Sequence, residues 1–257
     1  MTVVAVLADP PRPGLALPTL AETSPLSETE AADLAAAMLR DTLRAAARSG
    51  GDLLVNYRAD EDLPETAVDP DEPAEAELRA LAADALDDPG EARFEVQVGS
   101  SVSARAGNTV THLLREEGAQ SVAVVRGDAP LVSRATIDAA AMKLRSNEVV
   151  LGPSTDGRAY LAGFTAPIDF DGALAPPELE TLVDRANDAG RDVDFLEMQP
   201  TVRTGADLPT LVSTIRSRWQ AERVVPEHTA EFVVETGLTV VDPDESGADG
   251  PRVVREG

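Results

Sequence analysis

Several residue types are rare or missing in this sequence, and each scarcity excludes a kind of site. The 257 residues include no cysteine, which excludes disulfides, thiolate metal sites and a thiol nucleophile. Aromatic residues make up only 3% of the chain, so the core must be aliphatic, and a base-stacking platform for single-stranded nucleic acid is not expected. The two histidines, His112 and His228, are isolated, so we expect neither a zinc site nor a nucleophile–histidine pair from them.

Lysine is almost absent, and acidic residues dominate the charge. Lys143 is the only lysine among 22 basic residues, and 46 acidic residues bring the formal net charge to −24. Such a surface suits concentrated salt, where the screening length shrinks to about 3 Å and self-repulsion costs little. The acidity argues against nucleic acid or an anionic membrane as a partner. A disordered acidic chain is the alternative, but the periodic aliphatic segments favour a folded protein.

Long hydrophobic runs are also missing. No stretch approaches the roughly 20 apolar residues of a membrane span. Residues 1–7 are apolar, but they are too few for a signal peptide and lack its basic start. We therefore expect a cytoplasmic protein.

Buried strands and amphipathic helices alternate along the chain. Apolar runs at 2–7, 53–57 and 121–125 predict buried strands, and periodic segments between them predict helices. This alternation is typical of a three-layer α/β/α fold with a mostly parallel sheet. We expect one α/β domain over residues 1–225, and an appendage over 226–257 with a strand at 238–241 and a frayed end.

Two aspartates are the main candidates for chemistry. In open parallel sheets, ligands bind at the carboxyl ends of the strands, which here are followed by the loops 8–14, 126–130 and 152–157. Asp128 follows the clearest strand and could hold a divalent ion on a diphosphate, or it could simply shape a turn before Pro130. Asp156 could be a second carboxylate in the same crevice, or part of an Asp-Gly turn.

Cationic and amide side chains near these loops are candidates for binding a nucleotide. Arg12, Arg126 and Arg158 could meet phosphate, or they could be solvated or neutralise nearby carboxylates. Gln97, at the end of a predicted strand, is a candidate contact to a base or ribose.

Segments of the chain match a known family in order and spacing. Pro11-Arg-Pro-Gly14 is similar to a Pro-x-Pro-Gly loop, and residues 126–130 are similar to a Gly-x-Asp-x-Pro motif. Residues 152–163 are similar to a Gly-Pro-x-x-Asp-Gly-Gly-Tyr-Tyr-Leu-x-Gly signature, and 32–41 and 204–208 resemble a first helix and a late segment of the same family. Over roughly residues 1–215, the chain resembles the glycosyltransferase-like family known as radical-SAM/selenodomain-associated transferases, as a divergent member of haloarchaeal type. More distantly it resembles the 2-phospho-lactate guanylyltransferases.

This resemblance implies a fold, a donor and a set of site residues. The implied fold is the nucleotide-diphospho-sugar transferase (GT-A) type, and the implied partner is a nucleotide or nucleotide-sugar with Mg²⁺ or Mn²⁺. Asp128 is the implied metal ligand, and Asp156 is the implied catalytic residue. The residues expected to contact the nucleotide are Leu7, Arg12, Gly14, Gln97, Gly127 and Arg158.

Departures from the family pattern leave two functions open. Residues 15–18 read Leu-Ala-Leu-Pro where the family has a Lys-Thr-Arg cluster for phosphates, and Arg158 and Ala159 replace a glycine and a tyrosine. The first hypothesis is a metal-dependent glycosyl- or nucleotidyltransferase. The second is a binding or scaffold protein that kept the fold and lost the reaction. Residues 226–257 could in addition mediate self-association.

Overall fold

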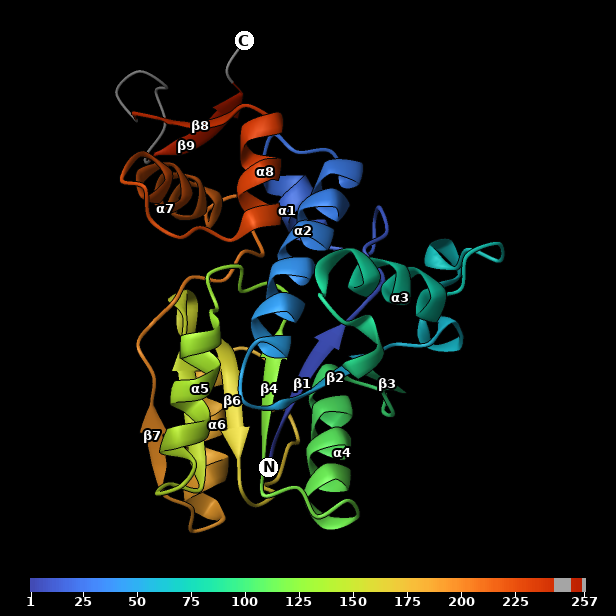
Figure 1. Ribbon diagram of the computed structural model, residues 1–257, viewed down its shortest axis with the longest axis vertical. Helices are drawn as coiled ribbons and strands as arrows, with labels where there is room; N and C mark the ends of the chain where they lie inside the picture. The colour runs from blue at the N-terminus through green and yellow to red at the C-terminus, as the bar shows by residue number, and fades with distance from the viewer. Residues whose placement is uncertain (243–250, 256–257) are drawn as a thin grey trace.

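A seven-stranded sheet forms the centre of the protein in the computed structural model, which describes residues 1–242 and 251–255. The strand order is β3-β2-β1-β4-β6-β5-β7, and every neighbouring pair is parallel except the two pairs that include β6. The predicted mostly parallel α/β sheet is therefore confirmed (Figure 1). The strands are β1 (Thr2–Ala8), β2 (Asp52–Tyr57), β3 (Arg93–Val96), β4 (Ser121–Arg126), β5 (Val149–Pro153), β6 (Ala159–Phe164) and β7 (Val193–Phe195).

The reversed direction of β6 follows from its short connection to β5. A parallel neighbour needs a crossover of about a dozen residues, whereas only residues 154–158 separate these two strands. Asp156 and Gly157 turn the chain with φ values of 58° and 67°, so β6 runs back antiparallel to β5 and β4.

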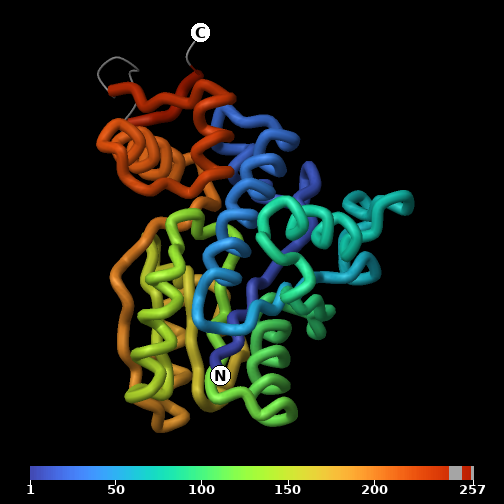
Figure 2. The backbone as a smooth tube through the Cα atoms, viewed as in Figure 1, coloured from blue at the N-terminus to red at the C-terminus, as the bar shows by residue number. Residues whose placement is uncertain are grey.

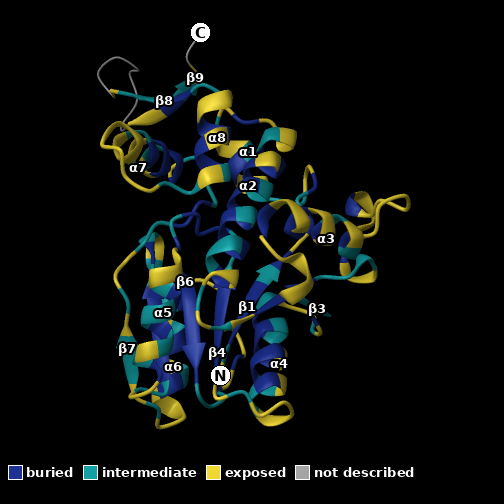
Figure 3. Cartoon of the chain, in the orientation of Figure 1, coloured by how far each residue is buried: buried dark blue, intermediate teal, exposed yellow. Residues whose placement is uncertain are grey.

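Helices cover both faces of the sheet. One face packs against α2 (Glu28–Ala47), α3 (Ala74–Ala85) and α5 (Arg134–Lys143), and the other against α4 (Val102–Arg115) and α6 (Glu178–Asp188). Successive β1 residues face opposite sides: Val4 and Val6 belong to the first core cluster, Val3 and Ala5 to the second. Since both faces are covered, the five inner strands are buried along most of their length, whereas the edge strands β3 and β7 are only partly buried (Figure 3). Short 3₁₀ turns lie at Asp60–Asp62, Glu65–Ala67, Pro89–Glu91 and Thr155–Gly157.

A third core cluster lies beyond the carboxyl ends of the parallel strands (Figure 1). It contains α1 (Pro18–Thr23), α7 (Leu208–Gln220), α8 (Glu227–Glu235), β8 (Leu238–Val241), β9 (Arg252–Arg255) and the first half of α2. The last part of the chain thus returns beside the N-terminal part, as Figure 2 shows. Helix α7 lies before the expected boundary at 225/226 and α8 after it, and both pack in this cluster.

The expected frayed end falls partly on residues that the structure does describe. Arg252–Arg255 form β9, which pairs antiparallel with β8. Residues 243–250 and 256–257 lie outside the described residues. Within 1–242 and 251–255, no helix combines the length and the apolar character needed to cross a membrane.

Candidate functional site

A pocket of about 340 Å³ opens where the strand order reverses. The chain proceeds from β1 to β2 and β3 on one side and then to β4 on the other side of β1. The crevice between the carboxyl ends of β1 and β4 is therefore a topological switch point, where ligands bind in open α/β sheets. The lining residues come from β1 and its loop (Leu7, Ala8, Asp9, Pro11, 15–19), α2 (Ala35, Met38, Leu39), the β3–α4 region (Gln97, Val102, Arg105), the end of β4 (126–128) and Arg203.

The charge of this lining is opposite in sign to that of the whole chain. Its charged members are three arginines and two aspartates, which gives a formal charge of +1. The chain as a whole carries −24. An anion therefore meets a local positive charge here, in a protein whose surface repels anions.

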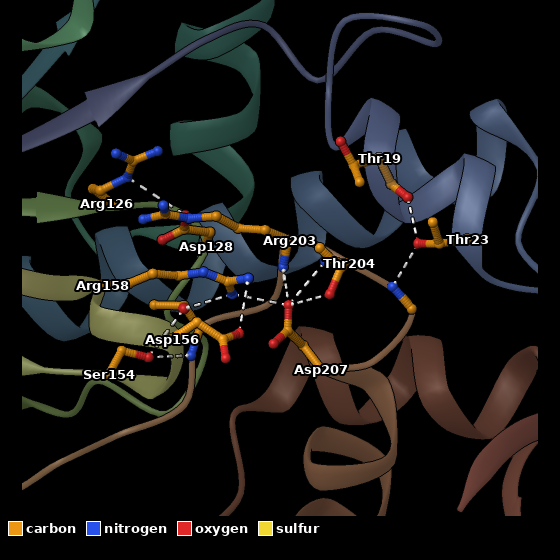
Figure 4. Close-up of polar contacts among 12 residues, drawn as sticks. Thr19, Thr23, Arg126, Asp128, Ser154, Asp156, Arg158, Arg203, Thr204 and Asp207 are labelled. Carbon is orange, nitrogen blue, oxygen red and sulfur yellow. Dashed lines mark hydrogen bonds and ion pairs between the residues drawn. The ribbon is translucent and has the colours of Figure 1, made fainter. Parts of the chain in front are cut away.

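Two arginines and two carboxylates form a compact network at the end of β4. Arg203 donates from Nε to Asp128 Oδ2 at 2.5 Å and from Nη1 to Glu178 Oε1 at 2.5 Å. Arg126 lies beside it, with Nε 3.4 Å from Asp128 Oδ2 and Nη1 3.7 Å from Glu178 Oε1. Figure 4 shows Arg126 and Arg203 converging on Asp128. Both carboxylates are buried, with Glu178 1% exposed.

The backbone holds Arg203 at this position. Val202 N–H donates to the carbonyl of Asp128 at 2.8 Å, and Arg203 N–H donates to Asp207 at 3.0 Å. Burial alone would lower the pKa of Arg203, but Asp128 and Glu178 outweigh it and raise that pKa above its usual value. The guanidinium group is thus a fixed positive charge.

Arg105 is the cation of the pocket that lacks a carboxylate partner among the described residues. Its Nε donates to Gln97 Oε1 at 2.7 Å, and its Nη1 donates to the carbonyl of Gly99 at 3.5 Å. Gln97 is itself fixed, because its amide donates to the carbonyl of Asn56 at 2.7 Å. Burial, and then repulsion from Arg58, lower the pKa of Arg105. An anion beside Arg105 would offset both effects.

The residues present do not fit a divalent ion held by Asp128. Two guanidinium groups already use Asp128 Oδ2, while Oδ1 is covered from solvent and has no hydrogen-bond partner in the described structure. The two arginines and two carboxylates are neutral together, so a divalent ion would leave +2 uncompensated. At about 5 Å and an effective dielectric constant of about 20, repulsion from each guanidinium is roughly 7 kcal/mol. The described residues also contain no group of three acidic or histidine side chains suited to a metal.

Asp156 and Arg158 belong to a second network, outside the pocket lining. The Asp156 side chain is 70% exposed and lies 3.3 Å from Arg158 Nη2. Arg158, 12% exposed, donates to Asp207 at 2.9 Å (Figure 4) and also to Thr201 at 3.3 Å. Burial would raise the pKa of Asp207, but bonds from the backbone of Arg203, from Arg158 and from Thr204 lower it overall. This network ties the turn at 154–158 to the segment 201–207.

Arg12 and Gly14 also lie outside the pocket lining. Arg12 is buried and donates to Glu77 at 2.8 Å, to Asp60 at 3.3 Å, and to the carbonyls of Ala67 and Glu72 at 2.7 and 2.6 Å. It therefore fastens the acidic loop before α3 to the loop after β1. Gly14 has a φ of 75°, a conformation that favours glycine.

Five of the predicted site residues thus line the pocket: Leu7, Gln97, Arg126, Gly127 and Asp128. The other four, Arg12, Gly14, Asp156 and Arg158, lie elsewhere. Sequence reasoning missed Arg105 and Arg203 as lining residues. Arg105 could have been found, because it lies in the first turn of the helix after β3, at the same edge of the sheet. Arg203 has no comparable signal, because it lies between β7 and α7 in a segment without regular structure.

An apolar wall completes the pocket. It includes Leu15, Leu17, Met38 and Val102. Leu17 has φ 50° and ψ 49°, a left-handed conformation that is costly for a residue with a branched side chain. The loop expected to lack phosphate-binding cations therefore contributes apolar surface.

Comparisons with known proteins agree with this architecture. A family model described as "Uncharacterized protein conserved in bacteria (DUF2064)" matches residues 42–179. A "putative nucleotide-diphospho-sugar transferase" from Desulfovibrio desulfuricans G20 is 21% identical, covers 91% of this chain and 94% of its own, and superposes with a TM-score of 0.72. A cytidylyltransferase from Leptospira borgpetersenii is 12% identical with a TM-score of 0.50, over 91% of this chain and 94% of its own. No curated protein matches the chain. The fold is thus of the nucleotide-diphospho-sugar transferase type.

Proposed function

We propose that this chain, which belongs to the DUF2064 family, binds a nucleotide or nucleotide-sugar in the pocket between β1 and β4 and transfers a glycosyl or nucleotidyl group from it. The observation that carries the proposal is the positively charged lining at the switch point of a chain with a charge of −24. The fold that the chain has in common with the Desulfovibrio protein supports a donor of this class.

The two sides of the pocket suit the two parts of such a ligand. The apolar wall, with Leu15, Leu17 and Met38, would cover the base or the ribose. Arg105 would meet the phosphate, since it has three or more N–H groups to offer and no carboxylate partner in the described chain. Gln97 would act as a positioning residue, because its bond to Arg105 sets the direction of the guanidinium group.

A binding protein without transfer activity is the second candidate, and one observation favours it. Asp156, the carboxylate expected to act in catalysis, is exposed and lies outside the pocket lining, and Asp128 is occupied by Arg203 and Arg126. Under this alternative the pocket still binds a nucleotide, but neither of these two aspartates is free beside it to take a proton from an acceptor.

Binding is tested first. Wild-type protein in concentrated KCl is titrated calorimetrically with a panel of nucleoside mono-, di- and triphosphates and nucleotide-sugars. Arg105→Gln removes a charge-assisted contact of about 1.5–3 kcal/mol, so it should weaken binding by at least about tenfold. Arg134→Gln is the matched control, since Arg134 is an exposed arginine paired with Asp138 on α5. If no nucleotide binds, or if both variants lose affinity equally, the proposal fails.

Turnover then separates the two candidates. Release of nucleoside diphosphate or pyrophosphate from the donor that binds, measured with a mixture of sugar, phosphate and alcohol acceptors, would establish the transferase. Tight binding without release under any of these acceptors would favour the binding protein.

A further inference from the structure

The network at the end of β4 has the geometry of a permanent substitute for a metal ion. Arg126 and Arg203 lie side by side, and each directs Nε toward Asp128 and Nη1 toward Glu178. We propose that the pocket takes its anionic ligand without a divalent ion, because these two guanidinium groups supply the positive charge at the position where an ion would need Asp128. The nature of the ligand rests on the proposed function, whereas the exclusion of the ion does not.

Both carboxylates of the network have their accessible oxygens engaged. Asp128 Oδ2 and Glu178 Oε1 each face both guanidinium groups. Glu178 Oε2 accepts the backbone N–H of Ala159 at 3.1 Å. A cation could reach Asp128 only after Arg203 had left, and that would break a pair between groups that are largely buried.

Arg126 and Arg203 make different contacts and therefore have different roles. Arg203 makes short bonds to both carboxylates and is held by the backbone bond from Val202 to Asp128. Arg126 lies 3.4 and 3.7 Å from the same carboxylates, beyond or at the limit of a good hydrogen bond, and is 24% exposed. Arg203 thus prevents a metal ion from reaching Asp128. Arg126 keeps N–H groups that can turn toward a phosphate, together with those of Arg105.

The metal alone gives the first test. Free Mn²⁺ is measured by electron paramagnetic resonance with wild-type protein in 2 M KCl, which suppresses weak binding by the acidic surface. We expect no stoichiometric site at millimolar Mn²⁺. One Mn²⁺ per chain that is displaced by Mg²⁺ and lost in Asp128→Asn would overturn the inference.

Variants of Arg203 test the cause. Arg203→Gln frees Asp128 and Glu178 as two facing carboxylates, so it should create a Mn²⁺ site at least tenfold tighter than any binding by wild type. Arg203→Lys keeps the charge and should not create one, and the double variant Arg203→Gln with Asp128→Asn should lose it. A Gln variant that folds and gains no site contradicts the inference. If that variant does not fold, the wild-type measurements still decide.

Ligand binding gives an independent readout. The nucleotide that binds best is titrated into wild-type protein with EDTA and then with Mg²⁺, and a nucleoside monophosphate, which binds Mg²⁺ weakly in solution, is included as a probe. For each nucleotide, we expect the affinity measured with EDTA to lie within about threefold of the affinity measured with Mg²⁺. Binding that requires Mg²⁺ overturns this inference and leaves the proposed function intact. If no nucleotide binds in either buffer, the proposed function fails, while the Mn²⁺ experiment still decides on the metal position.

Discussion

Asp41 is expected to fasten the C-terminal elements to the rest of the protein. It lies on α2, is 7% exposed, and accepts His228 N–H at 3.1 Å, Thr229 N–H at 2.8 Å and the Thr229 hydroxyl at 2.6 Å. These amides belong to the first turn of α8, whose own N-cap residue, Pro226, makes no side-chain capping bond. Asp41 therefore caps α8 from another helix, and its negative charge is favourable at a helix N-terminus.

Asp41→Ala should destabilise the protein by about 2–4 kcal/mol. Each buried N–H left without an acceptor costs about 1–3 kcal/mol, and two are affected here. Relief of the buried charge offsets part of this loss, since burial raises the pKa of Asp41 despite the three bonds that lower it. With a urea dependence of about 3 kcal/mol per molar, the unfolding midpoint should fall by about 1 M. Trp219, the only tryptophan, lies on α7 but is 59% exposed in the folded protein, so far-UV circular dichroism follows the transition in place of its fluorescence.

The matched control is Asp33→Ala, an exposed aspartate on the same helix. Hydrogen exchange should show faster exchange at the start of α8 in Asp41→Ala only. The pH dependence has a definite sign. The pKa of Asp41 in the folded protein lies above its ordinary value of 3.8. Between pH 3.8 and the folded pKa, the native state therefore binds this proton more tightly than the unfolded state does. The contribution of Asp41 to the free energy of unfolding is full at low pH and falls as the pH rises through the folded pKa. Equal midpoints for Asp41→Ala and Asp33→Ala would refute the capping argument.

Three further predictions concern packing, pH and salt. Gly152→Ala should cost about 1–3 kcal/mol in urea unfolding, because an added Cβ would lie 2.5 Å from Tyr160 Cζ, whereas Gly50→Ala, with its nearest neighbour at 3.6 Å, should have little effect. Glu30 has its pKa lowered to about 2, first by the bond from Arg255 and then by Ser27, so wild type should lose stability as pH falls from 4.5 toward 2, and Glu30→Gln should flatten that part of the profile. The urea midpoint should rise between 0.15 and 1 M KCl, as the screening length falls from about 8 to about 3 Å and repulsion within a chain of charge −24 weakens; a flat or falling midpoint would argue against salt adaptation.

Local patterns were sufficient to predict the main elements of the fold. The predicted buried apolar runs correspond to β1, β2 and β4, and serine residues cap α2 and α5. Helix α1 was missed, because six residues are too few to show a periodicity. The direction of β6 depends on the length of one connection rather than on the strand's own residues.

The candidate site was predictable only where position in a strand determines position in space. Asp128 and Gly127 line the pocket because they directly follow β4. Arg203 meets Asp128 across 75 residues, through a contact that no local pattern indicates. Arg12 is directed away from the pocket because the acidic loop before α3 folds back onto it, and that loop shows no regular period.

The segment that carries most of the resemblance, residues 152–163, serves the packing of the fold. Gly152 lies against the ring of Tyr160, whose hydroxyl donates to the carbonyl of Glu197 at 2.9 Å. Gly163 lies against Leu144, where an added Cβ would be 2.9 Å from a methyl group. The pocket instead takes its character from Arg203 and from the apolar loop at 15–18, and this loop departs from the family pattern. Because packing and pocket chemistry reside in different residues, the signature predicts the fold well and the reaction poorly, and the measurement of turnover is what decides on the reaction.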